Sequence, residues 1–230
     1  MVQNEKNKNP IPQDQDSQIA DSETNHLIKN EVNFMLYPMG NVWGKSNKKT
    51  IIYRNVIRVD GMEKEIIWKA LGTDEHGLPG PGAMETDMAI TKLINQKRWP
   101  VGIILETTLY EIAVTKGVTP NGNNINLIKK DLRELGTISF ESKYTFKGKW
   151  LPNGEKYLNA IVRKYDAIIL KGDLVSEKLQ AEIPTDKYGR SDKVYIVLSE
   201  LYRSSLNSHY TRELDYDFMM SLPGALEKRL

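Results

Sequence analysis

The sequence predicts an α+β fold in which antiparallel strands come before a group of helices and a β-hairpin comes after it. Three short runs after residue 30 are rich in β-branched and aromatic residues, which predicts a small antiparallel layer: EVNFMLYP, KTIIYRNVIRV and KEIIWKALG. Three segments with helical periodicity come next, followed by a strictly alternating run and a returning strand. Three helices and a hairpin in this order are typical of a winged helix-turn-helix domain with a β-hairpin wing.

Composition divides the chain into a tail and a folded region. Residues 1–30 contain many Gln, Asn, Asp, Ser, Lys and Pro side chains and almost no aliphatic ones. They cannot bury enough surface to offset the entropy lost on folding, so we expect a disordered N-terminal tail. The chain has 230 residues and is 40% hydrophobic, which is enough for a proper core. Residues 31–212 are predicted to form the winged-helix domain.

Several functional classes are disfavoured by what the sequence lacks. The chain has no cysteine, which excludes disulfides and thiolate metal sites. No apolar run approaches the roughly 20 residues needed to cross a bilayer, and residues 1–30 lack the apolar centre of a secretion signal. We therefore expect a cytoplasmic protein with no membrane partner. The net charge of +2 is too small to identify a partner, so a nucleic-acid surface requires cations gathered on one face.

The first two helices are predicted from their end signals. The turn-rich segment GLPGPG at 77–82 precedes AMETDMAITKLINQKRW, which has apolar residues at helical spacing and acidic residues near its start. The next segment, ETTLYEIAVTKG, offers Thr107 or Thr108 as an N-cap and ends on Lys116 and Gly117. These signals predict a short second helix.

The third helix, predicted over residues 121–136, combines an apolar stripe with an unusual polar face. Its apolar stripe contains Ile125, Ile128, Leu132 and Leu135. The opposite face carries amides and cations: Asn123, Asn126, Lys130 and Arg133, with Lys129 on the flank. Asparagine is a poor helix former, but its amide can pair with adenine in the major groove, as Lys or Arg can with guanine. We interpret this face as a base-reading surface and Asn121 as the N-cap.

The hairpin after the third helix is predicted to be a basic wing. The run TISFESKYTF alternates strictly, KGKWLPNG supplies turn residues, and YLNAIVRKYDAIIL returns as a second strand. Six cations gather in this region: Lys143, Lys147, Lys149, Lys156, Arg163 and Lys164. Only Glu141 and Glu155 oppose them, so we expect the wing to contact DNA phosphates. The alternative is that the polar helix face and the lysine-bearing hairpin are simply solvated.

Other motifs do not support catalysis. The glycines of GNVWGKS, at 40–46, are one residue too close for a phosphate-binding loop. His26, His76 and His209 lie far apart, without the spacing of a metal site or of a nicking enzyme. Asp215 and Asp217 are interpreted as capping or solvent-facing residues. We therefore assign no catalytic residue, no metal and no cofactor, and expect that the protein is not an enzyme.

Two segments near the C-terminus have simpler interpretations. Residues 171–192 are long and polar, which predicts a mobile connection. The run KVYIVLSELYRSSL is predicted to be a strand. Its apolar residues Val194, Ile196 and Leu198 are expected to complete the core, although the strand could instead form a protein contact.

Three blocks resemble successive blocks of plasmid replication initiator proteins of the replication initiator protein A type: GLPGPGAMETDMAITKLI, TTLYEIAVTKGVTPNGNNINLIKKDLRELGTISFES and HYTRELDYDFMMSLPGALEKRL. The resemblance covers most of the chain from about residue 31 onward. It places the DNA-reading helix at 121–135 and the wing at roughly 143–164. Residues 213–230 resemble a linker and the first turns of a second, truncated winged-helix domain.

The resemblance implies a protein without enzyme chemistry that binds repeated double-stranded sites at a plasmid origin. Such a protein promotes opening of the adjacent duplex and recruits host replication proteins. Because similar initiators dimerise through their first winged domain, a homodimer is also an expectation. Two alternatives stay open. A winged-helix transcriptional regulator, including one that represses its own gene, would use the same face. A nucleotide-dependent or nicking replication enzyme would need motifs that this sequence lacks.

Overall fold

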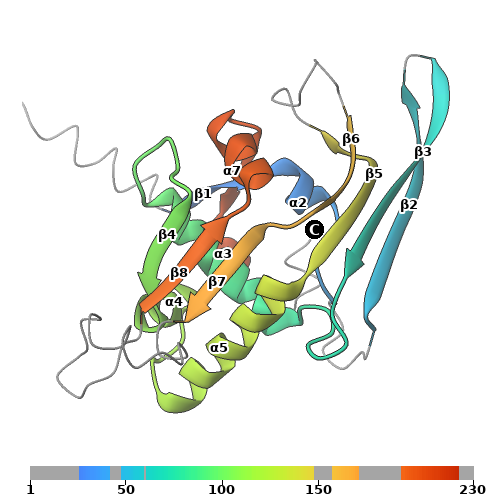
Figure 1. Ribbon diagram of the computed structural model, residues 1–230. Helices are drawn as coiled ribbons and strands as arrows, with labels where there is room; N and C mark the ends of the chain where they lie inside the picture. Colours follow the sequence, from blue (N-terminus) through green and yellow to red (C-terminus); the bar gives the residue numbers. More distant parts are fainter. Residues whose placement is uncertain (1–25, 42–47, 60, 148–156, 171–192, 223–230) are drawn as a thin grey trace, which may run out of the picture.

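The computed structural model describes residues 26–41, 48–59, 61–147, 157–170 and 193–222, in which helices pack between antiparallel sheets (Figure 1). Its elements in chain order are β1 (Leu27–Glu31), α2 (Val32–Leu36), β2 (Thr50–Val59), β3 (Met62–Leu71), α3 (Pro81–Asn95), β4 (Ile104–Thr108), α4 (Leu109–Lys116), α5 (Gly122–Thr137), β5 (Ser139–Lys147), β6 (Tyr157–Val162), β7 (Tyr165–Leu170), β8 (Lys193–Leu198), α7 (Glu200–Asn207), β9 (Thr211–Asp215) and α8 (Tyr216–Ser221).

The three predicted helices α3, α4 and α5 are confirmed, together with most of their end signals. Pro81 occupies the first position of α3, where its missing N–H costs nothing. Thr108 caps α4 by accepting a hydrogen bond from the backbone N of Glu111 at 3.0 Å. Gly117 ends α4 in the left-handed region, at φ 81°, which an L side chain rarely adopts.

A three-stranded antiparallel sheet, with strand order β4-β8-β7, packs beside these helices. Val194, Ile196 and Leu198 on β8 are all buried, so this strand completes the core as expected. The second half of the predicted strand is instead the helix α7, whose N-cap is Ser199. Strand β4, which joins α3 to α4, was not predicted.

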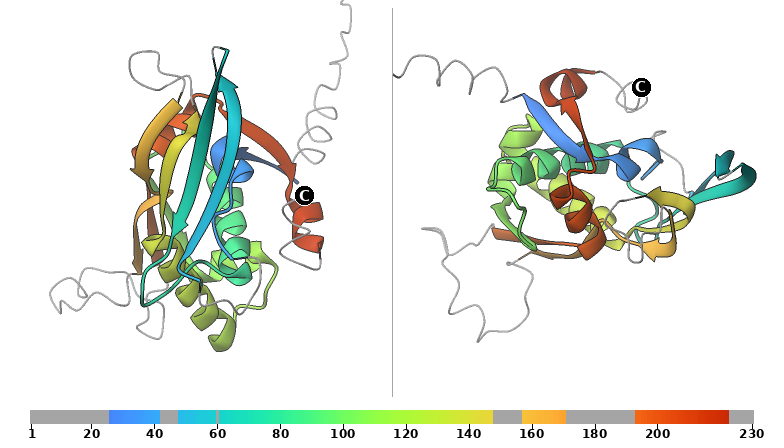
Figure 2. Two further views of the ribbon diagram at one scale, coloured as in Figure 1. Left: turned by 90° about the vertical axis from the view of Figure 1, so that its right-hand side faces the viewer. Right: turned by 90° about the horizontal axis from the view of Figure 1, so that it is seen from above.

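A second sheet, of four antiparallel strands in the order β2-β3-β5-β6, lies beside the first and contacts α2 through β5. Trp68 on β3 and Phe140 on β5 are fully buried and stacked, with ring centroids 5.0 Å apart. The first half of the predicted returning strand is confirmed as β6, which pairs antiparallel with β5, whereas its second half is β7, a strand of the other sheet. Figure 2 shows that the far part of the β2–β3 hairpin extends away from the rest of the molecule.

The N-terminal boundary differs from the prediction. Residues Leu27–Glu31 form a strand that pairs with β9, and Ile28 is buried, so residues 27–30 do not belong to a tail. The following residues, Val32–Leu36, were predicted to be a strand and form the helix α2, because the Glu31 carboxylate caps it by accepting from the backbone N of Phe34 at 2.9 Å. Residues 1–25 lie outside the described residues.

The expected boundary at residue 213 falls inside β9, which pairs along its length with β1. Directly after it, Tyr216 is buried and donates a hydrogen bond to the carbonyl O of Thr115 at 2.6 Å. Asp215 accepts from the backbone N of Phe218, which agrees with the capping role proposed for it. Residues up to 222 therefore pack on the same body as the helices, and the remainder of the proposed second domain lies outside the described residues.

Candidate nucleic-acid interface

The orientation of α5 is set by a polar network that joins the three helices. The Lys116 ammonium, at the end of α4, donates to the Asp131 carboxylate on α5 at 2.9 Å. It also donates to the carbonyl O of Gly82 at 2.8 Å and to the Thr86 hydroxyl at 3.0 Å, both on α3. Thr86 in turn donates to Asp131 at 2.7 Å. Each of the three helices thus supplies at least one member of a buried and satisfied polar network.

The second acidic residue of α5 also points inward. The Glu134 carboxylate accepts from the backbone N of Gly80, the N-cap of α3, at 3.1 Å. A negative charge at this end of α3 is favourable because the helix dipole is positive there. With Asp131 and Glu134 both buried, the exposed side of α5 carries cations and amides but no carboxylate.

The predicted polar face of α5 is exposed as a unit. Lys129 is half-buried, and the other four residues are exposed: Asn123, Asn126, Lys130 and Arg133. Lys130 lies 3.6 Å from Glu134, one turn along the helix. Leu127, on the same side, is 57% exposed. The structure therefore brings the five predicted base-reading residues together, while their contact with bases stays a prediction.

The first turn of α5 shows why two of its asparagines are present. The Asn121 side chain accepts from the backbone N of Asn124 at 2.9 Å, which is the predicted N-cap. The Asn124 amide donates to the carbonyl O of Thr119 at 2.8 Å and ties the preceding turn to the helix. Asn121 and Asn124 therefore hold the helix end, whereas Asn123 and Asn126 lie on the exposed face of α5.

The predicted wing cations are not one surface. Lys143 and Arg163 are exposed, and the Lys143 ammonium lies 4.0 Å from the Glu65 carboxylate. The prediction for Lys164 is wrong, because its side chain is buried and donates to the Asp87 carboxylate of α3 at 2.6 Å. A charge enclosed in this way cannot contact phosphate. Lys149 and Lys156 lie outside the described residues, and so does the side chain of Lys147.

The hairpin also runs in the wrong direction for the predicted wing. Strand β5 begins directly after α5, and its nine residues extend over about 30 Å. Figure 1 shows β5 and β6 rising away from α5, which lies at the opposite end of the molecule. The pairing of β5 with β3 fixes this direction. The predicted arrangement, in which the β5–β6 hairpin lies beside the base-reading end of α5, is therefore wrong.

Sequence reasoning missed the lysine–aspartate pairs that position the helices. Asp87 accepts hydrogen bonds from the ammonium of Lys164 and from the hydroxyl of Tyr165, the latter at 2.7 Å. A signal was present, because Asp87 shares a helical stripe with Ile90 and Ile94, and an acid within an apolar stripe needs a buried partner. Burial alone would lower the pKa of Lys164, but the interactions with Asp87 and Tyr202 together outweigh it and raise that pKa.

No group of three His, Asp or Glu side chains within the described ranges could hold a metal ion. Among the helices that the structure describes, none is long and apolar enough to cross a membrane.

Comparison with known proteins identifies the fold. No protein-family model and no curated protein matches this sequence. Among solved structures, a crystal structure of domains 2 and 3 of RctB superposes with a TM-score of 0.50 at 13% identity, over 80% of this chain. A second structure of RctB domains 2–3 has a TM-score of 0.45 at 12% identity and covers 77% of this chain. The chain spans 63% of the first structure and 58% of the second, which is less than two thirds of either. The mixed α and β architecture is thus shared with these RctB domains.

Proposed function

We propose that this protein is a sequence-specific double-stranded DNA-binding protein that acts as a plasmid replication initiator. In this proposal it binds repeated sites at an origin, promotes opening of the duplex and recruits host replication proteins, without catalysing a reaction itself. The fold supports the proposal, since RctB, whose domains 2 and 3 share it, is a replication initiator. The resemblance of three sequence blocks to plasmid initiators points the same way.

The order of elements supports a winged helix-turn-helix, with a different wing from the one predicted. Helices α3, α4 and α5 are followed by β7 and β8, and β4 completes their sheet in the order β4-β8-β7. In this arrangement β7 and β8 have the chain positions of the two strands of a wing. Strands β5 and β6 then form an insertion that joins β2 and β3. We expect α5 to enter the major groove.

The observation that carries the proposal is the charge distribution on α5. Its two carboxylates are turned into the protein, whereas Asn123, Asn126, Lys130 and Arg133 all face outward. Apart from Leu127, this face presents only cations and amide groups, whereas a solvated helix face usually mixes charges of both signs. Those are the groups that pair with the major-groove edges of guanine and adenine.

The test is a binding selection from a pool of random-sequence DNA duplexes, followed by titration of the enriched sequence. We expect the wild type to enrich one motif, and Asn126→Ala and Arg133→Ala each to lose about 1 to 3 kcal/mol of discrimination at one base pair. Lys143→Ala is the matched control, because Lys143 lies on the β2-β3-β5-β6 sheet, and it should keep the wild-type preference. If Asn126→Ala weakens random and enriched duplexes equally, Asn126 does not read a base.

Initiation and gene regulation are separated by duplex opening. The same face of α5 would serve a winged-helix transcriptional regulator, so binding alone does not distinguish the two functions. Supercoiled plasmid carrying the enriched repeats beside an A·T-rich segment is treated with permanganate, which modifies unpaired thymines. An initiator makes that segment reactive, whereas a regulator binds the repeats and leaves it unreactive.

Sedimentation of the protein with and without the repeats measures whether it forms the expected homodimer.

A further inference from the structure

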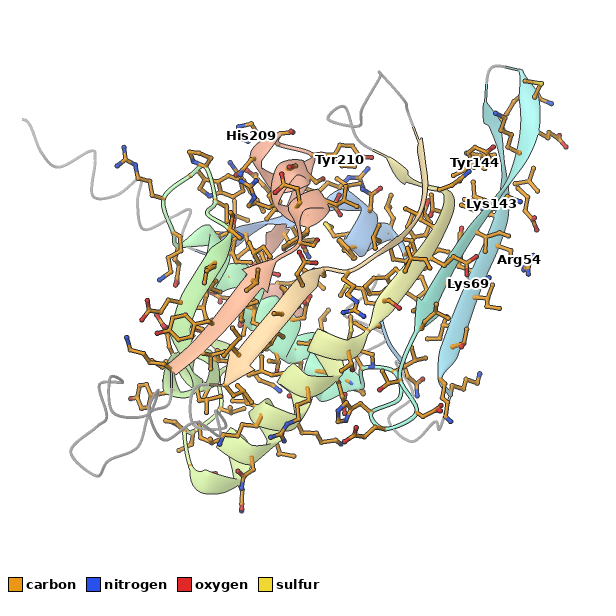
Figure 3. The ribbon with its side chains drawn as sticks, viewed as in Figure 1. Arg54, Lys69, Lys143, Tyr144, His209 and Tyr210 are labelled. Carbon is orange, nitrogen blue, oxygen red and sulfur yellow. The ribbon has the colours of Figure 1, made fainter. Side chains whose placement is uncertain are left out.

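A basic and aromatic surface lies at the end of the molecule opposite α5. It is formed by the α3–β4 connection, the end of α7 and strand β1, and we call it the end patch: Lys29, Lys97, Arg98, Trp99 and His209. Figure 3 shows His209 near the end of α7, far from α5. We propose that the end patch binds single-stranded nucleic acid, with one base stacked on His209. This inference does not depend on duplex binding by α5.

Local contacts hold the elements of the end patch together. The Asn95 side chain, at the end of α3, accepts from the backbone N of Lys29 at 2.8 Å and donates to its carbonyl O at 2.9 Å. The Asn207 side chain makes the same two bonds to the backbone of Val101, at 2.7 and 3.1 Å. The connection that carries Lys97, Arg98 and Trp99 is therefore fixed against both β1 and α7, so the patch is preorganised.

Aromatic rings form a platform within the patch. The rings of Trp99 and His209 are stacked, with centroids 6.1 Å apart and planes 17° apart. The Lys29 ammonium lies 5.9 Å from the centre of the Trp99 ring. His209 is exposed, and its backbone is in the left-handed region at φ 56°, where its N–H donates to the carbonyl O of Leu206 at 2.9 Å. The turn thus presents an aromatic side chain to solvent on top of a second ring.

The cations of the patch differ from those on the β2-β3-β5-β6 sheet in lacking counter-ions. Among the described residues, no ion pair involves Lys29, Lys97, Arg98 or His209, although Glu213 lies opposite Lys29 across the β1–β9 pair. On the sheet, by contrast, the three labelled cations of Figure 3 each lie near a carboxylate: Arg54 and Glu65 at 3.1 Å, Lys69 and Glu141 at 2.7 Å, and Lys143 and Glu65 at 4.0 Å.

The combination of unpaired cations and an exposed ring fits a single strand better than a duplex. A duplex keeps its base faces stacked on one another and offers phosphates and base edges, neither of which needs an aromatic partner. A single strand exposes base faces, which stack on aromatic side chains while its phosphates contact nearby Lys and Arg. Lys97 and Arg98, which precede Trp99 directly in the chain, are placed to make those phosphate contacts.

The experiment measures the affinity of the full chain for fluorescent oligothymidylate at several salt concentrations. His209→Asn removes the ring but keeps a residue that tolerates the left-handed backbone, and His209→Tyr keeps an aromatic ring. We expect His209→Asn to weaken binding about fivefold or more, the effect of losing one stacked base, and His209→Tyr to retain most of the affinity. Lys97→Ala and Arg98→Ala should each reduce the salt slope by about 0.7.

Two controls separate this inference from the proposed function. Arg54→Ala changes a paired cation on the sheet and should leave oligothymidylate binding unchanged. Lys130→Ala should weaken duplex binding only, whereas His209→Asn should leave the duplex selected through α5 bound as before. The inference is overturned if the wild type does not bind oligothymidylate, or if His209→Asn together with Arg98→Ala binds it as well as the wild type. If the wild type binds oligothymidylate but no duplex, the proposed function of α5 is wrong and the inference on the end patch still holds.

Discussion

Helix α3 is held by two lysine–aspartate pairs of the same chemistry in different surroundings. Near its start, Lys116 and Asp131 connect it to α4 and α5. One turn further on, Lys164 and Asp87 connect it to the point where the chain passes from β6 to β7. The first pair positions the proposed DNA-binding helix, and the second fixes the junction between the two larger sheets. Helix α3 therefore anchors both the α4–α5 helices and the junction between the two larger sheets.

Burial distinguishes the two pairs. The side chains of Lys164 and Asp87 are 1% and 4% exposed, and the Lys164 ammonium lies 5.0 Å from the centre of the Tyr202 ring. The side chains of Lys116 and Asp131 are 8% and 11% exposed, so water can reach the edge of this pair. The cost of leaving one partner alone rises with burial, because an unpaired charge loses its hydration. Removal of the lysine should therefore lower the free energy of unfolding more at the Lys164–Asp87 pair than at the Lys116–Asp131 pair.

The largest effect is expected for Lys164→Met. This change leaves the Asp87 carboxylate buried without its cation, which should lower the free energy of unfolding by about 3 to 5 kcal/mol. Urea denaturation followed by circular dichroism measures it. The double variant Asp87→Asn with Lys164→Met removes both charges and should recover a large part of the loss, since the Tyr165 hydroxyl can still donate to the Asn oxygen. A loss below about 1 kcal/mol in the single variant would show that the pair is not buried as described.

A smaller loss is expected for Lys116→Met. The Asp131 carboxylate keeps the hydrogen bond from Thr86 and can gain water, so the loss should be about 1 to 3 kcal/mol. The same denaturation experiment measures it. Lys129→Met is the matched control, because Lys129 is a half-buried lysine on α5 that makes no ion pair within the described ranges. Equal losses in the two variants would mean that the network does not hold α5.

The two pairs also mark the limit of what the sequence could predict. The ends of α4 and α5 follow from local rules, because Thr108, Gly117 and Asn121 act on residues next to them in the chain. The role of Lys164 depends on Asp87, 77 residues away, so the sequence alone predicts one more lysine of a basic hairpin. Asp87 and Asp131 lie within apolar stripes, which predicts that each has a buried partner without saying which one.

Strand pairing explains why the proposed site was only half predicted. The exposed face of α5 follows from periodicity within one segment, and its five predicted residues do lie together. The sheet that receives β5 and β6 depends on β2 and β3, which are distant in sequence. No local pattern shows that the chain inserts this hairpin before β7, so the cations on it were placed beside α5.

The N-cap residue Asn121 stabilises α5 at its first turn, apart from the Lys116–Asp131 network. Asn121→Ala removes the acceptor for the backbone N of Asn124 and should lower the free energy of unfolding by about 1 kcal/mol. Asn123→Ala, two residues later on the exposed face, should change it by less than about 0.5 kcal/mol. Chemical denaturation compares the two. A loss at Asn123 as large as that at Asn121 would contradict the assignment of the cap.

The smallest effect is expected at Glu31, a buried carboxylate with no ion pair among the described residues. It accepts hydrogen bonds from Asn33 at 2.6 Å and Ser205 at 2.7 Å, yet its burial raises its pKa above the ordinary 4.5. The folded state therefore holds this proton more tightly than the unfolded state, and stability falls as pH rises from about 4.5 through the folded pKa. In Glu31→Gln this contribution is absent, so the wild-type free energy of unfolding minus that of the variant should decrease over that range. A flat difference would instead show that the hydrogen bonds from Asn33 and Ser205 offset the burial of this carboxylate.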